Sequence, residues 1–153
     1  MSNQGGFHSN EEAFTAATTW YSPLLPLLHA ALQRIGADYS HEAAITGWIN
    51  ASAPSAFNSL HDHGTSIWSM VYFVDDGGCA AQEDAELWGC LLLRTQLVPF
   101  THKYAFMAAR PRPGDLWLFP GYLSHAVLPR QLKEHGEGSG SLRVSVACNL
   151  APC

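Results

Sequence analysis

The chain has 153 residues and a formal net charge of −5, which fits one globular domain able to bury a core of its own. Its 8 lysine and arginine residues form no basic stripe of the kind that binds nucleic acid, and no apolar run reaches the ~20 residues of a membrane span. The polar first residues also lack the features of a secretory signal, so we expect a cytoplasmic protein with no nucleic-acid or membrane partner.

The N-terminal part is predicted to contain a tail and one or two helices. Residues 1–8 are polar and glycine-containing, which predicts a disordered tail. Ser9 and Glu12 have the spacing of a capping box, and leucines recur at helical spacing farther along the chain. These signals predict helices within residues 9–36, with Gly36 ending the last of them.

From residue 44 onward the apolar pattern changes from a helical to an alternating period. Turn residues separate strand-like runs at 45–50, 57–63, 66–74, 87–94, 104–108, 116–119, 123–128 and 141–150. About eight short strands in one domain are typical of a β-sandwich or jelly roll. We expect a mainly β, α+β protein: a single domain over 1–153, with a jelly-roll barrel at 44–150 and the helices packed on its outside.

Two histidines, His61 and His63, stand two residues apart at the end of a predicted strand. Alternate residues of a strand point to the same face, so both imidazoles can converge on one metal ion. Asp62 would point to the other face unless a bulge reverses it. A distant third histidine, His125, completes a pattern that suits a β-barrel site better than a zinc finger. Ordinary core or surface histidines are the alternative, because this chain contains 8 of them.

The last predicted strand has two different faces. Its apolar face can pack on the helices, whereas Arg143 and Ser145 share the other face. A guanidinium matches a carboxylate with a planar fork, and a hydroxyl adds a donor, so inside a barrel this pair would bind an anion. The alternative is a salt bridge at the rim of the barrel or an arginine that faces solvent.

The order and spacing of these motifs resemble those of the iron(II)- and 2-oxoglutarate-dependent oxygenase superfamily, and in particular one of its small branches. The likeness covers about residues 45–150. It is carried by Trp48–Asn50, Asn58–His63, Trp68–Val74, Gly114–Pro120, Leu123–Pro129 and Arg143–Ser145 with Asn149.

The resemblance implies a double-stranded β-helix with Fe(II) at the mouth of the barrel and 2-oxoglutarate along its interior. His61 and His125 match the two histidine ligands of the superfamily. Arg143 and Ser145 match the pair that binds the distal carboxylate of 2-oxoglutarate, and Tyr72 would be a further donor to that group.

One position departs from the common pattern. Most of the superfamily has Asp or Glu two residues after the first histidine, where this chain has His63. We therefore favour a three-histidine site of His61, His63 and His125, with Asp62 as the fallback ligand.

The expected activity is that of a hydroxylase-type oxygenase that uses Fe(II), 2-oxoglutarate and O2 on a small molecule or a peptide side chain. A cupin-like three-histidine metalloenzyme without 2-oxoglutarate, either thiol dioxygenase-like or with copper or zinc, is the alternative. A non-catalytic β-barrel binding protein is the third reading. Exposed strand edges also leave room for a homodimer.

Overall fold

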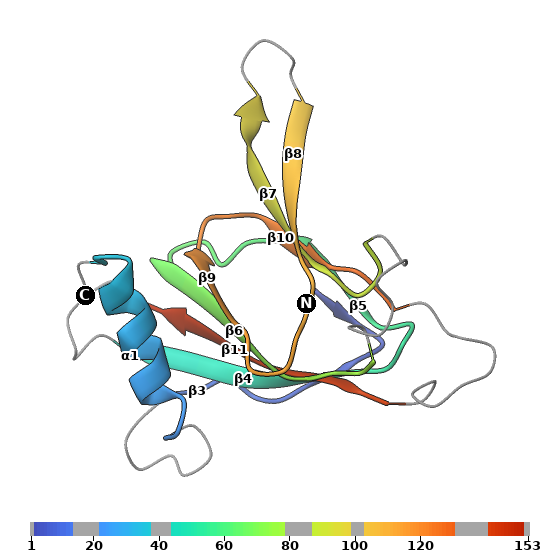
Figure 1. Cartoon of the computed structure of the whole chain (residues 1–153), viewed down its shortest axis with the longest axis horizontal. Coiled ribbons are helices and arrows are strands. Elements are labelled where there is room, and N and C mark those ends of the chain that lie inside the picture. Colours follow the sequence, from blue (N-terminus) through green and yellow to red (C-terminus); the bar gives the residue numbers. More distant parts are fainter. Residues whose placement is uncertain are drawn as a thin grey trace.

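The computed structural model describes residues 2–13, 22–37, 44–78, 87–98, 103–130 and 141–151. These residues form one helix, α1 (Leu25–Arg34), and eleven strands (Figure 1). The strands are β1 (Asn3–Gln4), β2 (Phe7–His8), β3 (Glu12–Ala13), β4 (Ile45–Ser52), β5 (Phe57–His61), β6 (Trp68–Asp76), β7 (Leu91–Val98), β8 (Lys103–Ala109), β9 (Leu116–Pro120), β10 (His125–Val127) and β11 (Arg143–Leu150). Within the described ranges, no helix combines the length and the apolar character needed to cross a membrane.

The strands form two antiparallel sheets. One has the order β1-β5-β10-β7-β8, and the other has the order β2-β4-β11-β6-β9, with β3 also paired to β4. Side chains of β6 and β9 from one sheet and of β7 and β8 from the other share a buried cluster of Phe73, Leu91, Leu93, Ala109 and Phe119. The two sheets therefore pack face to face, which confirms the predicted jelly-roll class. The described strands make two sheets rather than one closed barrel.

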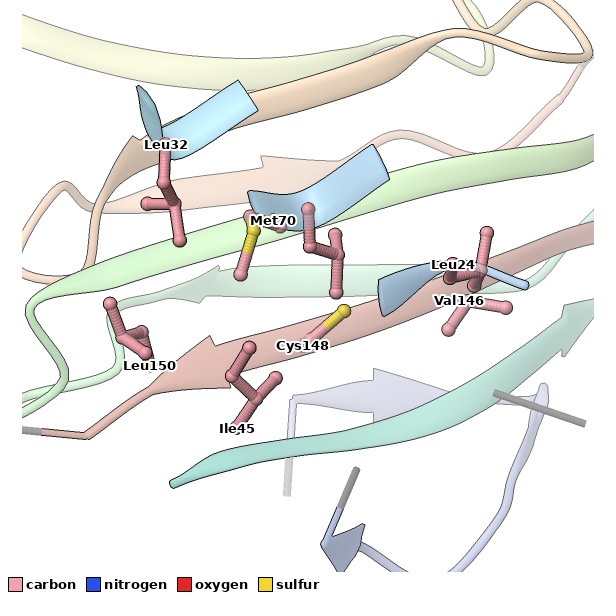
Figure 2. Close-up of a cluster of buried hydrophobic side chains, with 8 residues drawn as sticks. Leu24, Leu32, Ile45, Met70, Val146, Cys148 and Leu150 are labelled. Atoms are coloured by element: carbon pink, nitrogen blue, oxygen red, sulfur yellow. The ribbon is translucent and has the colours of Figure 1, made fainter. Parts of the chain in front are cut away.

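Helix α1 covers the outer face of the second sheet (Figure 1). Its buried leucines, Leu28 and Leu32, contact the apolar side of β11, as Figure 2 shows for Leu32 and the strand residues around it. The cluster consists of Leu24, Leu28, Leu32, Ile45, Met70, Val146, Cys148 and Leu150. This contact confirms that the apolar face of the last strand packs on a helix.

Gly36 ends α1 as predicted. Its φ of 65° lies in the left-handed region, which glycine adopts without a steric penalty. The Gly36 N–H donates to the Gln33 carbonyl at 3.0 Å, and the Ala37 N–H donates to the Leu32 carbonyl at 3.1 Å. This pair of bonds is the Schellman motif, which satisfies carbonyls at the end of a helix.

The N-terminal residues differ from the sequence-based expectation. The predicted tail at 1–8 is wrong for residues 3–8, because β1 pairs with β5 and β2 pairs with β4. Ser9 does not cap a helix: its hydroxyl accepts the Ile49 N–H at 2.9 Å, and β3 begins at Glu12. Ladder hydrogen bonds to β4 and β5 here outweigh the local capping signal. The rest of that predicted helix, residues 14–21, lies outside the described part of the chain.

Replacing Leu28 by alanine should destabilise the protein by about 2–5 kcal/mol, because the side chain is fully buried between α1 and the sheet. The measurement is urea unfolding followed by circular dichroism. The adjacent Leu27 is 50% exposed, so Leu27→Ala is the matched control and should change the free energy of unfolding by only ~0.5 kcal/mol. Equal losses in the two variants would contradict the observed packing face of α1.

Candidate metal centre

Three histidines from two separate segments meet at one point. His61 is the last residue of β5 and His125 is the first residue of β10, and these two residues oppose each other in the antiparallel ladder. His63 follows two residues after His61. The ring centroids are 4.3 Å apart for His61 and His125, 5.0 Å for His63 and His125, and 5.2 Å for His61 and His63. One nitrogen from each ring lies within 4.8 Å of the other two, which is close enough to share a metal ion.

His63 is placed by a turn, whereas the sequence predicted a strand. Strand β5 ends at His61, and the His63 N–H donates to the Gly121 carbonyl at 2.9 Å. A Cβ on Gly121 would lie 2.1 Å from the Ser66 carbonyl oxygen, so only glycine permits this close approach. The turn that carries His63 is thereby held in contact with Gly121, in the segment that precedes β10.

Asp62 is not part of the histidine cluster. Its side chain is exposed, and Oδ1 accepts the Gly64 N–H at 3.0 Å, which closes an Asx-turn. Gly64 follows with a φ of 52°. The carboxylate thus has a structural role in the same turn that brings His63 inward.

Backbone carbonyls fix the tautomers of two of the imidazoles. His61 Nδ1 lies 2.7 Å from the Ser59 carbonyl, and His125 Nδ1 lies 2.9 Å from the Leu123 carbonyl. Because a carbonyl can only accept, each Nδ1 carries the proton, and Nε2 of the neutral ring keeps its lone pair. This is the arrangement that orients histidine ligands at metal sites.

Burial keeps two of the rings uncharged. Desolvation, reinforced by the neighbouring His125 and His61, lowers the pKa of His63 from 6.5 to about 4. Desolvation also lowers the pKa of His125 to about 4, against the opposing effect of its hydrogen bond to Leu123. Neutral imidazole is the form that binds metal, so both rings are ready to act as ligands near neutral pH.

The histidines open into a cavity of about 280 Å³ between the two sheets. This volume lies just below the usual range for ligand pockets, so the cavity suits a small molecule. The polar and charged residues that line it are Ser2, His8, Glu11, Asn50, Ser52, Asn58, His61, His63, Ser69, His125, Arg143 and Ser145.

Arg143 and Ser145 lie in this cavity as predicted, and both are buried. Arg143 Nη1 donates to the Gly89 carbonyl at 3.0 Å and to the Leu128 carbonyl at 3.2 Å. These bonds hold the guanidinium at the end of β11, opposite Ser52 in the neighbouring β4. The structure therefore brings the arginine, the serine and the three histidines to one cavity.

Tyr72 does not belong to this group. It packs against the hydrophobic cluster beneath α1 and is absent from the cavity lining. The sequence-based assignment of Tyr72 as a cosubstrate donor is wrong because side chains alternate along β6. Phe73 and Val71 face the cavity, and the Tyr72 side chain therefore points to the helix.

Sequence reasoning missed the contribution of the N-terminal segment, residues 2–13. Ser2, His8 and Glu11 of this segment line the cavity. The His8 ring stacks on Trp48 with centroids 5.4 Å apart, and Trp48 in turn lies 5.6 Å from His63. Alternation within β4 could have placed Trp48 and Asn50 on one face, but no local signal connects His8 to that face.

The metal-free protein should lose stability as the pH falls from about 6.5 to about 4. Above pH 6.5, His63 and His125 are neutral in both states, but between pH 6.5 and about 4 only the unfolded chain takes up their protons. The free energy of unfolding therefore decreases as the pH falls through this window. Urea unfolding in the presence of a chelator measures the effect. The variant His125→Asn should show a shallower pH dependence, and an unchanged slope would contradict the burial of the neutral ring.

Comparison with known proteins identifies the family. Residues 46–149 match the model of a family described as "Putative 2OG-Fe(II) oxygenase". A prolyl-4-hydroxylase from Pseudomonas putida is similar in structure, with a TM-score of 0.59 and 15% identity over 99% of this chain and 72% of that chain. Vicilin from Corylus avellana (hazelnut) gives a TM-score of 0.56 and 13% identity over 97% of this chain and 29% of that chain.

At these identities the two solved structures establish a shared fold alone. No curated protein sequence matches this chain. The family model, in contrast, spans more than half of the residues, including the three histidines and the Arg143–Ser145 pair. The chain therefore belongs to the family that this model describes.

Proposed function

We propose that this protein is a non-haem Fe(II)- and 2-oxoglutarate-dependent oxygenase of the hydroxylase type. The observation that carries the proposal is the convergence of His61, His63 and His125 at one end of a cavity that also contains Arg143 and Ser145. A metal site next to a carboxylate receptor is what a 2-oxo acid with a second carboxylate requires. Family membership supports the same chemistry.

The donor set fits a divalent first-row metal ion. His61, His63 and His125 would each contribute one imidazole nitrogen, with His61 and His125 using Nε2. If these three residues held an iron ion, its remaining coordination positions would be available to the 2-oxo acid and to O2. Neutral imidazole in place of a carboxylate leaves the site with about one more positive charge, which favours a dianionic cosubstrate.

The residues at the other end of the cavity fit the distal carboxylate of 2-oxoglutarate. The Arg143 guanidinium supplies the positive charge, and the Ser145 hydroxyl supplies a further donor. Both side chains are buried, so the attraction acts where water screens it least. When bound, iron and the 2-oxo acid together supply oxidation of a substrate by O2, with succinate and CO2 as the products of the cosubstrate.

The protein's own contribution is to position the reactants and to exclude water. Backbone carbonyls orient His61 and His125, and the carbonyl of Gly121 holds the turn that carries His63. Since the cavity measures only about 280 Å³, little space is left beside the cosubstrate. We infer that the primary substrate inserts a small group, as a small metabolite or a peptide side chain would do.

The ligand set also favours a second candidate function. Three imidazoles without a carboxylate suit copper and zinc as well as iron, and Asp62 is directed into its own turn. A three-histidine metalloenzyme that does not use 2-oxoglutarate would employ Arg143 to bind a carboxylate of the substrate itself. Thiol dioxygenase-like chemistry falls in this class.

Anaerobic titration with Fe(II) in the presence and absence of 2-oxoglutarate tests the proposal. We expect a new visible absorption band only when both are present, because the 2-oxo group must chelate the iron. Admission of O2 should then yield succinate. Glutarate is the matched control ligand: it has both carboxylates but lacks the 2-oxo group, so it should give no band.

Other outcomes of this titration are equally informative. Iron, copper or zinc binding that is indifferent to 2-oxoglutarate, with no succinate, would select the second candidate. Failure to bind any of these metals would remove both candidates and leave the non-catalytic reading.

The variants His63→Ala and Asp62→Asn distinguish the two ways to complete the metal site. Loss of a direct ligand should weaken Fe(II) or Mn(II) binding by at least about 100-fold, beyond the usual effect of outer-shell changes. Asp62→Asn keeps the oxygen that accepts the Gly64 N–H, so it should bind metal as the wild type does. Calorimetric titration under anaerobic conditions is the measurement. The reverse ranking would assign the third ligand to the carboxylate.

A further inference from the structure

The N-terminal segment contains a β-bulge where it runs along β4. His8 of β2 opposes Asn50, whereas Glu12 of β3 opposes Gly47. Regular antiparallel pairing that continued from His8 would bring residue 11 opposite Gly47, so the N-terminal side has one additional residue between the two strands. A bulge changes which side chains share a face of the sheet, and bulges are common beside functional sites.

Hydrogen bonds of Ser9 hold the bulge in place. The Ser9 N–H donates to the Ile49 carbonyl at 3.0 Å, and the Ser9 hydroxyl accepts the Ile49 N–H at 2.9 Å. In a regular ladder the Ser9 carbonyl would accept that N–H, but here it lies 2.5 Å from His8 Nδ1. Because a carbonyl only accepts, His8 Nδ1 is the donor, and Nε2 of the neutral ring keeps its lone pair.

The bulge directs His8 and Glu11 into the same cavity. In a regular strand His8 would share its face with Asn10, but it is Glu11 that lines the cavity and Asn10 does not. The His8 ring stacks on Trp48, and Trp48 lies 5.6 Å from His63. Both side chains of the N-terminal segment therefore lie near the end of the cavity that contains the three histidines, which we call the metal end.

Glu11 provides the only carboxylate among the described residues that line the cavity. Because Glu12 opposes Gly47, the preceding residue Glu11 lies beside Trp48 and thus at the metal end. Its side chain is exposed, so a molecule that enters from solvent can reach it. The guanidinium of Arg143 lies at the other end. The cavity therefore has a negative charge at the metal end and a positive charge at the opposite end.

The charge of the loaded site makes this carboxylate important for the choice of substrate. Three neutral imidazoles would leave a divalent metal ion with two positive charges, and a dianionic 2-oxo acid would cancel them. The charge that a primary substrate meets at the metal end is then the charge of Glu11. This carboxylate attracts a cationic substrate and repels an anionic one.

We propose that Glu11 and His8 form the subsite for the primary substrate and bind a protonated amine on an alkyl chain. The carboxylate of Glu11 and Nε2 of neutral His8 only accept hydrogen bonds, whereas an alkylammonium group only donates them. Trp48 lines the cavity beside both residues and offers apolar surface to the alkyl chain. This inference rests on the proposed function, because it takes the bound molecule to be the primary substrate of the oxygenase.

Three four-carbon probes that differ in charge test the subsite: n-butylamine, n-butanol and butyrate. The protein is loaded with Zn(II) and 2-oxoglutarate, so that no turnover occurs, and each probe is titrated while the ¹⁵N–¹H spectrum of the protein is recorded. We expect butylamine to bind about 10-fold more tightly than butanol, because it adds a charge-assisted hydrogen bond. Butyrate should bind most weakly.

Substitutions of two adjacent glutamates provide the matched comparison. Glu11→Gln keeps the shape and removes the charge, so butylamine and butanol should then bind within about 3-fold of each other. Glu12→Gln makes the same charge change at an exposed residue outside the cavity lining, and it should keep the preference for the amine. Glu11→Lys should reverse the order of butylamine and butyrate.

A fourth probe distinguishes the two sources of such an amine. Nα-acetyl-lysine methylamide presents the same butylammonium group on a peptide backbone. Tighter binding of this probe than of butylamine would identify a lysine side chain of a peptide as the substrate group. Weaker binding would identify a free alkylamine, because the cavity of about 280 Å³ leaves little space for the backbone.

Two results would overturn the inference. One is equal binding of butylamine, butanol and butyrate to the wild type, a comparison that needs no variant to fold. The other is an equal loss of the amine preference in Glu11→Gln and Glu12→Gln. Absence of the absorption band with Fe(II) and 2-oxoglutarate would count against the proposed function itself. A normal band without any preference for the amine would remove the present inference alone.

Discussion

The pairing of β5 with β10 is the constraint on which the site depends. It brings His61 and His125, which are far apart in the sequence, to opposing positions in one antiparallel ladder. Ladder hydrogen bonds fix the backbone, and the carbonyls of Ser59 and Leu123 fix the rings. Two of three candidate ligands are therefore positioned by main-chain groups alone. A metal ion would meet a preformed pair and pay little conformational entropy for ordering it.

The third histidine depends on tighter packing. Its turn is held by the Gly121 carbonyl, and the close contact of Gly121 with Ser66 leaves no room for a side chain. Gly121 itself lies only four residues before His125. The same short segment therefore determines the positions of both His63 and His125, so a shift of this segment would move both candidate ligands.

Strand β11 was the most predictable element, because apolar and polar residues alternate along it. The alternation indicates which face packs on α1 and which face lines the cavity. Apolar residues face α1, and Arg143 and Ser145 face the cavity, as the sequence indicated. The spacing of the three histidines in the sequence also predicted that they cluster. The expected reason for the position of His63, a strand that continues through residue 63, is wrong. Strand β5 ends before that residue, and a turn produces the inward direction that alternation was expected to give.

The features that the sequence did not predict depend on contacts between residues far apart in the chain. Residues 3–8 looked like a polar tail because two-residue strands carry no periodic signal, yet they form ladders with β4 and β5. Tyr72 was assigned to the cavity by resemblance alone, whereas its side chain packs against the hydrophobic cluster beneath α1. The bulge that directs Glu11 into the cavity likewise depends on the pairing of the N-terminal segment with β4.

The N-terminal segment shows why the site and the fold form together. It pairs with β5 of one sheet and then with β4 of the other, so residues 2–13 join the two sheets beside the cavity. The crossing includes Gly5, whose φ of 73° lies in the left-handed region that favours glycine. His8 then stacks on Trp48, which approaches His63. Strands from the two ends of the chain flank β4, so closure of the cavity requires contacts of large sequence separation. Because such contacts bear the full entropy of loop closure, a ligand that bridges both sheets would stabilise the part of the fold that is most costly to form.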